Sequence, residues 1–420
     1  MSARLLQLAW RNLWRNPRRT FIAMAAIALG YTMLLFVACL MAGLRWQMIE
    51  NGTRLVLSEI QVHAPGYYPS RSIQETIGGA NGTDVSTLLA AVTADPRVYA
   101  AAPRVYGYGL ASASHGSSAG VALMGVVPEQ EPKITVLNTQ IVKGSYLTKP
   151  MANRIVLGDK LAGVIGVDVG SEIVLLTQAA DGSMGNDLYT VCGIFHTGLD
   201  VMDRNLVLMT LPALQDLLQL TPKRIHEVGI KLNNITEATT VASALQTRLS
   251  KTLPVEVSPW PELAPELADY VQFNHGVTLV LFCIFFLLAV IGIMNTMLMA
   301  VFERTRELGM LMALGMRPIH VIGLIMAEAA GLAVGSLVVG AAIGAPLLWY
   351  LQAHGLDLGG STGEVVSVAG VVVGHLWYGR QDFSAYAEAA VGLALTALVS
   401  ALYPAWRAAH FRPSEAIRKV

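Results

Sequence analysis

The chain has 420 residues, of which 54% are hydrophobic and 14% charged, and its formal net charge is zero. A soluble globular protein carries about 25% charged residues, so this composition excludes an ordinary soluble enzyme and indicates a large surface that faces lipid. The balanced charge argues against a nucleic-acid partner. Cys39 and Cys283 lie within apolar runs and leave Cys192 alone outside them. We therefore expect neither an intradomain disulfide nor a cysteine-based metal site.

The first 19 residues are predicted to form an amphipathic helix on the cytoplasmic side. At about 100° per residue, its arginines fall within one sector of about 60°, and leucine and tryptophan side chains point the opposite way. This pattern is typical of a helix on the inner leaflet, although the arginines also suit an ordinary basic flank. Asn16 is then a candidate cap and Pro17 a candidate first residue of the next helix. The basic face consists of Arg4, Arg11, Arg15 and Arg18, and the apolar face consists of Leu6, Trp10 and Leu13.

Four apolar runs are long enough to cross a membrane, which takes about 20 residues. We predict membrane helices over residues 20–44, 276–302, 319–353 and 386–406, one before the large polar stretch and three after it. At about 1.5 Å per residue the first two reach about 37 and 40 Å. This is more than the hydrocarbon requires, so we expect these helices to tilt or to project as stalks.

Basic residues in the short flanks predict the orientation. Arginine and lysine gather in the N-terminal flank, in the segment 303–318 and in the tail 407–420. In a chain with four spans these three segments lie on the same side, so both termini are predicted to be cytoplasmic. Residues 45–275 and the loop 354–385 then lie outside.

Residues 45–275 are predicted to form a large α+β extracytoplasmic domain. Strand-like runs such as Glu172–Leu176 and Tyr189–Phe195 are separated by turns such as Asp181-Gly182. Strands mixed with helices over about 230 residues suit one or two α+β subdomains. Helical patches are expected at 84–93, 211–220 and 237–249.

One Gly-x-Ser-x-Gly match, Gly116–Gly120, is the nearest approach to a catalytic motif. A nucleophile elbow needs a strand before it and a helix after it, whereas Val121–Met124 is strand-like. We interpret the match as a hairpin turn. Neither a Gly-x-x-x-x-Gly-Lys phosphate loop nor a His-Glu-x-x-His zinc motif occurs. No catalytic, cofactor-binding or metal-binding residue is therefore predicted.

The segment 303–318 is the most informative part of the chain. It is predicted to form a short cytoplasmic helix with a charged entry and an apolar stripe, ended by Gly315 and Pro318. An apolar stripe outside the membrane needs a cover, either the chain's own membrane helices or, as we favour, a protein partner. The candidate coupling residues are Glu303, Arg304, Arg306, Glu307, Leu308, Leu311, Met312 and Gly315.

Two polar residues, Glu328 and Asn295, are candidates within the spans. A bare charge at membrane depth costs a few kcal/mol, so Glu328 is expected to face protein. We favour a role as an anchor between helices, with a role toward protons or substrate as the alternative. The motifs Gly331–Gly335 and Gly340–Gly344 permit close approach of neighbouring helices.

The stretch Glu303–Gly315 closely resembles the E-R-x-x-E-[IL]-G-[IM]-L-x-A-L-G signature of ABC transporter permeases of the MacB/FtsX superfamily. The opening Leu8–Arg19 is similar to the start of that family, and the ending Tyr403–Ala409 with Pro413–Arg418 is similar to its end. The one-plus-three order of spans also matches, so the resemblance covers essentially the whole chain.

Within this superfamily the chain is most similar to the lipoprotein-releasing branch, the LolC/LolE type. The similarity lies in the segments Glu59–Tyr67, Ile155–Gly158 and Val167–Ser171. The length of the loop 354–385 also fits this branch better than the macrolide-efflux branch.

The resemblance implies a permease subunit of the bacterial inner membrane that is not itself an enzyme. ATP and Mg²⁺ would be bound by two copies of a separate cytoplasmic ATPase, so this chain would need no cofactor. A second permease protomer, identical or paralogous, is expected, and a periplasmic adaptor or acceptor protein is a further candidate partner. The implied mechanism is mechanotransmission that releases a lipidated or hydrophobic cargo such as lipoproteins. The alternatives are efflux of amphiphiles or peptides through an adaptor, and regulation of a cell-wall hydrolase without transport, as in FtsX-like proteins.

Overall fold

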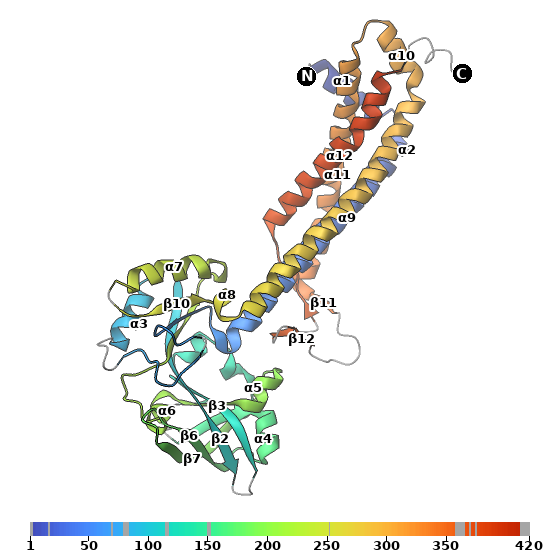
Figure 1. Cartoon of the computed structure of the whole chain (residues 1–420). Coiled ribbons are helices and arrows are strands. Elements are labelled where there is room, and N and C mark those ends of the chain that lie inside the picture. The colour runs from blue at the N-terminus through green and yellow to red at the C-terminus, as the bar shows by residue number, and fades with distance from the viewer. Residues whose placement is uncertain are drawn as a thin grey trace. The chain divides into compact units, whose positions relative to one another are not determined.

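The chain divides into two compact units in a computed structural model (Figure 1). The helical unit comprises Met1–Trp46, Gln272–Gly363 and His375–Val420, and the strand-rich unit comprises Gln47–Val271 and Glu364–Gly374. The expected cap at Asn16 and the basic tail beyond residue 411 lie outside the described residues. The structure describes residues 3–15, 17–68, 70–78, 84–113, 117–148, 153–251, 253–357, 366–368, 371–373 and 376–411.

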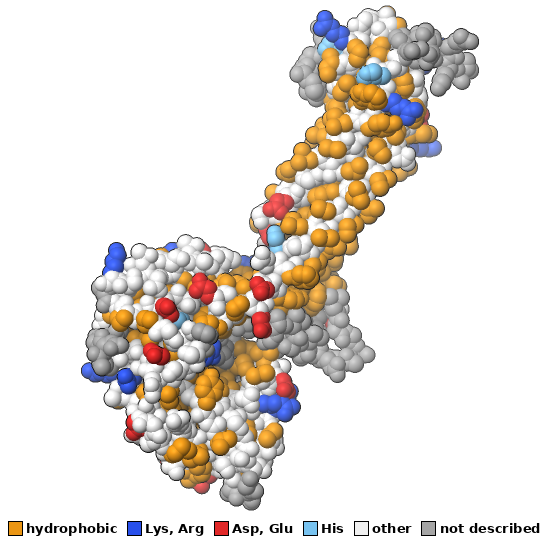
Figure 2. All heavy atoms as spheres, in the orientation of Figure 1, with side chains coloured by type: hydrophobic (Ala, Val, Ile, Leu, Met, Phe, Trp, Pro, Cys, Tyr) orange, Lys and Arg blue, Asp and Glu red, His pale blue; other side chains and the backbone are white. Residues whose placement is uncertain are grey.

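Four helices are long and apolar enough to cross a membrane, as the sequence predicted. Apolar side chains run along the surface of these helices on the face in Figure 2, as contact with lipid requires. With 36 and 39 residues, α2 and α9 are about 54 and 58 Å long at about 1.5 Å per residue. The hydrocarbon core is only about 30 Å thick. The four are α2 (Pro17–Gly52), α9 (Pro265–Glu303), α11 (Pro318–His354) and α12 (Phe383–Ala409).

The helix ends follow from local chemistry. Both α9 and α11 begin with proline, whose missing N–H costs nothing at the first position. Asp382 caps α12 by accepting hydrogen bonds from two backbone N–H groups of the first turn, both at 3.2 Å. The short helix α10 (Thr305–Ala313) joins α9 to α11, and Gly315 after it has a φ of 94°, a left-handed conformation that favours glycine. A further short helix, α1 (Ala3–Leu13), precedes α2.

Glycines on α11 allow α1 and α2 to pack closely against it. A Cβ atom at Gly331 would lie 2.8 Å from Leu13 Cδ1, and one at Gly340 would lie 2.7 Å from the carbonyl oxygen of Ala28. The Thr32 hydroxyl donates a hydrogen bond to the Gly340 carbonyl at 3.0 Å. The Gly-x-x-x-Gly motifs therefore pack helices within this chain, which is the usual use of small residues between membrane helices.

The strand-rich unit is built on a ten-stranded sheet in the order β10-β1-β9-β2-β3-β8-β5-β7-β4, with β6 paired to β2 and β7. The pairs β3–β8 and β5–β7 are parallel, and the other pairs are antiparallel. The strands are β1 (Ile60–His63), β2 (Val98–Ala113), β3 (Ser118–Val126), β4 (Ile141–Gly144), β5 (Arg154–Gly158), β6 (Glu172–Gln178), β7 (Met184–Phe195), β8 (Leu206–Thr210), β9 (Glu227–Leu232) and β10 (Glu256–Pro259).

The long strand β2 belongs to both halves of this sheet. Its first part, to Arg104, pairs with β9, and its second part, from Val105, pairs with β3 and β6. Figure 1 shows α3 and α7 beside β10, and α4, α5 and α6 around the other half. The helices of this unit are α3 (Val85–Thr93), α4 (Asp159–Ile165), α5 (Asp200–Asn205), α6 (Leu211–Leu217), α7 (Ala238–Leu249) and the short α8 (Trp260–Leu263) before α9.

The segment between α11 and α12 contains two small strand pairs. These are β11 (Leu356–Asp357) with β14 (Leu376–Trp377), and β12 (Val366–Val368) with β13 (Val371–Val373).

Candidate functional site

A buried polar network lies at the α10 end of the helical unit. One guanidinium nitrogen of Arg304 donates to both carboxylate oxygens of Glu328, at 2.9 and 3.1 Å. Asn12 Nδ2, on α1, donates to the same carboxylate at 2.7 Å. Glu328 is only 7% exposed, so its charge is both paired and hydrogen-bonded, as burial demands. The network thereby joins α1, the start of α10 and α11.

A second ion pair joins the turn after α1 to α10. Arg15 donates to Glu307 from both terminal nitrogens, one of them at 2.9 Å, and Arg304 Nε lies 3.5 Å from the same carboxylate. The hydrogen bonds from Arg15 lower the pKa of Glu307 below its ordinary value, against a smaller opposing effect of burial. Because both side chains are more than a third exposed, this pair contributes at most about 1 kcal/mol.

The apolar stripe of α10 packs against the chain's own helices. Leu308 is 5% exposed and belongs to a cluster with residues of α1, α9, α11 and α12, and Met312 packs against that cluster. The expectation that Leu308 faces a partner was therefore wrong, because neighbouring helices cover it. The apolar side chains that this segment leaves open are Met310, 46% exposed, and Leu314, 86% exposed.

The other predicted coupling residues surround this stripe. Glu303 ends α9 and is exposed, and Arg306 is exposed on α10. Leu311 is partly buried and Gly315 is exposed after the helix.

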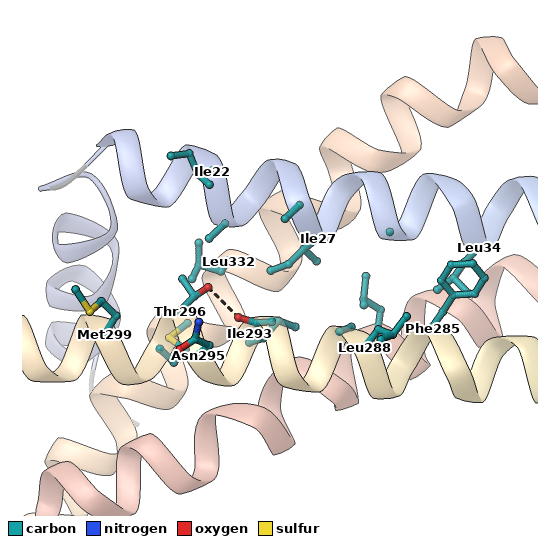
Figure 3. Close-up of a pocket in the computed structure, with 17 residues that line it drawn as sticks. Ile22, Ile27, Leu34, Phe285, Leu288, Ile293, Asn295, Thr296, Met299 and Leu332 are labelled. Atoms are coloured by element: carbon teal, nitrogen blue, oxygen red, sulfur yellow. Dashed lines mark hydrogen bonds between the residues drawn. The ribbon is translucent and has the colours of Figure 1, made fainter.

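An apolar cavity of about 560 Å³ lies between α2 and α9 (Figure 3). This volume is within the range of about 300–1,000 Å³ that is usual for ligand sites. Gly30 on α2 and Gly292 on α9 both line the cavity, and neither has an atom within 4 Å of the position that a Cβ would take. Two missing side chains thus help to keep it open. Its larger apolar residues include Ile22, Ile27 and Leu34 of α2, Phe285 and Leu288 of α9, and Leu332 of α11.

Two polar residues of α9 line this apolar cavity. The Thr296 hydroxyl donates to the Gly292 carbonyl at 2.9 Å, the dashed line in Figure 3, and is satisfied within the helix. Asn295 is exposed, and its side-chain amide has no hydrogen-bond partner among the described residues. Since an unpaired polar group within a span is costly, Asn295 is a candidate to meet a ligand or another chain.

Sequence reasoning missed one cluster, in the strand-rich unit. Asp159, His196 and Asp203 place potential ligand atoms within 4.8 Å of one another. His196 Nδ1 lies 2.9 Å from Asp159 Oδ2 and 3.4 Å from Asp203 Oδ2. Asp203 is fully buried and accepts hydrogen bonds from the backbone N–H groups of Thr197 and Gly198. Hydrogen bonds from the loop thus hold the Asp203 carboxylate, and His196 lies beside both carboxylates of the cluster. The spacing of the three residues in the sequence does not match a metal-ligand motif, and only folding brings them together.

The Gly-x-Ser-x-Gly match leads into a strand, as predicted, and Gly116 lies outside the described residues. Its described residues begin β3, which pairs antiparallel with β2 and sets Ser112 opposite Ser118. A strand–turn–strand context does not present a serine as a nucleophile elbow does.

Two protein families together match most of the chain. The MacB-like periplasmic core domain matches residues 20–248, more than half of the chain. The FtsX-like permease C-terminal domain matches residues 279–413. The chain belongs to the MacB/FtsX superfamily of ABC transporter permeases. This permease is therefore a multi-pass subunit of the inner membrane with a large periplasmic domain, as the resemblance of Glu303–Gly315 predicted.

Two related proteins match the permease along nearly its whole length. The lipoprotein-releasing system transmembrane protein LolC of Xylella fastidiosa strain Temecula1 is 29% identical over 96% of the permease and 95% of that protein. LolC of Neisseria meningitidis serogroup B is 24% identical over 95% of the permease and 94% of that protein. The permease is thus most like the lipoprotein-releasing branch, as predicted.

Two solved structures are also similar to the permease. The periplasmic region of MacB from Actinobacillus actinomycetemcomitans covers 53% of the permease and 98% of that chain, at 11% identity and a TM-score of 0.36. The extracellular domain of the Gram-positive transporter YknZ covers 47% of the permease and 98% of that chain, at 10% identity and a TM-score of 0.33.

Proposed function

We propose that this permease extracts a lipidated cargo, such as a lipoprotein, from the inner membrane. The observation that carries the proposal is the apolar cavity between α2 and α9. It lies between two membrane helices, and α11 and α12 each contribute one residue to it. Its mostly apolar lining suits acyl chains better than a hydrated solute, and its volume of about 560 Å³ is within the usual range of ligand sites. The names of the LolC relatives favour the same cargo. Efflux through an adaptor and regulation without transport gain no comparable support.

Two copies of a cytoplasmic ATPase would supply the energy, and they would hold the ATP and Mg²⁺. The basic flanks predict that both termini and α10 lie in the cytoplasm. There the exposed side chains of Met310 and Leu314 offer apolar anchors for the ATPase, and the charged residues Glu303 and Arg306 offer a polar rim.

A second permease protomer would face the cavity. The α9 helix is the most exposed of the four spans. Only 17% of the most apolar 18-residue stretch of this helix is buried. An identical or paralogous protomer would cover part of this face and could supply a partner for the Asn295 amide.

Movement would pass from the ATPase to the periplasmic domain through rigid parts. A push on α10 would reach α11 through Arg304 and Glu328, and would reach the turn after α1 through Glu307 and Arg15. The α2 and α9 helices exceed the bilayer thickness by about 20 Å or more. They are therefore suited to carry the movement outward and to close the cavity on its cargo.

The test is to fill the cavity from within. Gly30→Leu and Gly292→Leu place a side chain into open space and favour the helix, so we expect both variants to fold. In liposomes that contain the ATPase and a lipoprotein, release of the lipoprotein should fall by about tenfold, because each leucine occupies volume that the acyl chain would fill, and a tenfold loss of binding corresponds to about 1.4 kcal/mol. Binding of the ATPase should be unchanged.

The matched control is Gly276→Leu, which lies on the same helix, also has open space around it and does not line the cavity. It should release lipoprotein at the normal rate. Normal release by Gly30→Leu and Gly292→Leu would remove the cavity from the cargo pathway.

A further inference from the structure

The strand-rich unit has an apolar hollow of its own. It has a volume of about 560 Å³ and is lined by parts of β2, β3 and α5 together with Arg71. Val201 on α5 and Tyr108 on β2 are 73% and 60% exposed. A hollow of this size with exposed apolar walls is suited to a ligand, and it is separate from the cavity between α2 and α9.

The floor of the hollow is made by residues that lack large side chains. In the β2–β3 ladder, Tyr108 lies opposite Ala122 and Leu110 lies opposite Gly120. Residues directly opposite each other share one face of a sheet, so Gly120 and Ala122 lie on the face that bears the exposed tyrosine. A Cβ at Gly120 would meet no atom within 4 Å. The hollow therefore exists because β3 has glycine and alanine where its neighbour has large residues.

Arg71 is the only cation that lines this hollow among the described residues. Its backbone has a φ of 49°, a left-handed conformation that is uncommon outside glycine and marks a constrained position. The side chain is partly buried and lies over the Tyr68 ring, 5.9 Å from its centroid. Its guanidinium has no hydrogen bond or ion pair with any described residue, so donors remain for a ligand.

A nearby buried cluster does not use these donors. Arg104 is fully buried and pairs with Glu131 at 2.6 Å and with Glu227 at 2.9 Å. The Tyr106 hydroxyl also donates to Glu227 at 2.9 Å. Glu227 attracts Arg71 electrostatically but lies beyond ion-pair distance. Arg71 thus completes no internal pair.

We propose that this hollow binds the acyl chain of an anionic single-chain amphiphile, with its carboxylate or phosphate held by Arg71. The apolar floor and the exposed Val201 and Tyr108 would cover the chain. The planar guanidinium suits a carboxylate or a phosphate, to which it can donate two parallel hydrogen bonds. A fatty acid and a lysophospholipid share this chemistry. The inference does not rest on the proposed function, because the hollow and the membrane cavity have no lining residue in common.

The test is photo-crosslinking to the full chain in nanodiscs. Three diazirine probes are compared, namely palmitate, lysophosphatidic acid and uncharged hexadecanol, and the labelled peptides are identified by mass spectrometry. The anionic probes should label residues 106–122 and 201–206, and hexadecanol should do so about tenfold less, since hydrogen bonds to charged groups are the strong ones. Labelling by only one anionic probe distinguishes a carboxylate from a phosphate ligand and still supports the site. Absence of labelling in both segments would overturn it.

Four variants separate the contributions of shape and charge. Gly120→Leu should reduce labelling by all probes, whereas Gly163→Leu, at an equally open glycine on α4, should not. Arg71→Gln should reduce labelling by the anionic probes to the level of hexadecanol, and Arg71→Lys should restore part of it. Equal labelling of Gly120→Leu and Gly163→Leu would exclude the hollow, and unchanged labelling of Arg71→Gln would exclude Arg71 as the anion site. Lipoprotein release by Gly30→Leu tests the proposed function separately.

Discussion

At the scale of single residues, Glu328 is the most informative position. Its carboxylate accepts hydrogen bonds from Arg304 and Asn12. These two residues belong to different elements and lie far from Glu328 in the sequence. Such a group anchors helices because neither the acid nor the arginine can be buried alone without a large cost. These contacts support the anchor hypothesis over a role toward protons or substrate.

We predict that Glu328→Gln is tolerated and Glu328→Leu is not. The glutamine oxygen can still accept from both Arg304 and Asn12, so thermal stability in detergent should fall only slightly. Leucine leaves the largely buried Arg304 guanidinium without its main partner, which should cost about 3–5 kcal/mol. Glu388→Leu is the control, because Glu388 is exposed on α12. A glutamine variant of normal stability that releases no cargo would instead favour a titrating role.

At the scale of elements, α10 shows how one short helix serves two surfaces. Leu308 belongs to the packed core of the helical unit, whereas Leu314 at its end is 86% exposed. The two leucines are six residues apart, about 1.7 turns at 3.6 residues per turn. The same residue type is therefore covered at one position and exposed at the other, because neighbouring helices pack against only one of them.

We predict that Leu314→Asp abolishes co-purification of the ATPase while the permease still inserts and folds, since the change removes an apolar anchor without burying a charge. Leu308→Asp should instead lower the free energy of unfolding of the permease itself by several kcal/mol, because it puts a charge into an apolar cluster. Val201→Asp, at an exposed apolar position of the strand-rich unit, is the control and should retain the ATPase. Full retention of the ATPase by Leu314→Asp would remove α10 as the docking element.

At the scale of the whole molecule, the four long helices and the strand-rich unit require a defined topology. We predict that a membrane-impermeant thiol reagent, added to intact spheroplasts, labels a cysteine placed at Asp181 in the β6–β7 turn and does not label one placed at Thr305. The exposed Cys283 is replaced in both variants, so that it does not contribute. Labelling of both positions from outside would contradict the orientation drawn from the basic flanks.

Much of the architecture was predictable from the sequence because membrane helices and strands have strong local signals. Long apolar runs located the four spans, and the strand-like runs Glu172–Leu176 and Tyr189–Phe195 are strands in the structure. The resemblance of Glu303–Gly315 to a permease signature predicted the superfamily to which the chain belongs.

The sequence alone thus determined the number of spans, the strand at Val121–Met124 and the acid that had to find a partner within the membrane. Only the tertiary structure decided that Arg304 is that partner, that Leu308 is covered while Leu314 is open, and that missing side chains leave two separate apolar hollows. The physical reason is that periodicity reports which residues share a face of one helix or strand. Which neighbour covers that face depends on contacts between segments that are distant in the chain.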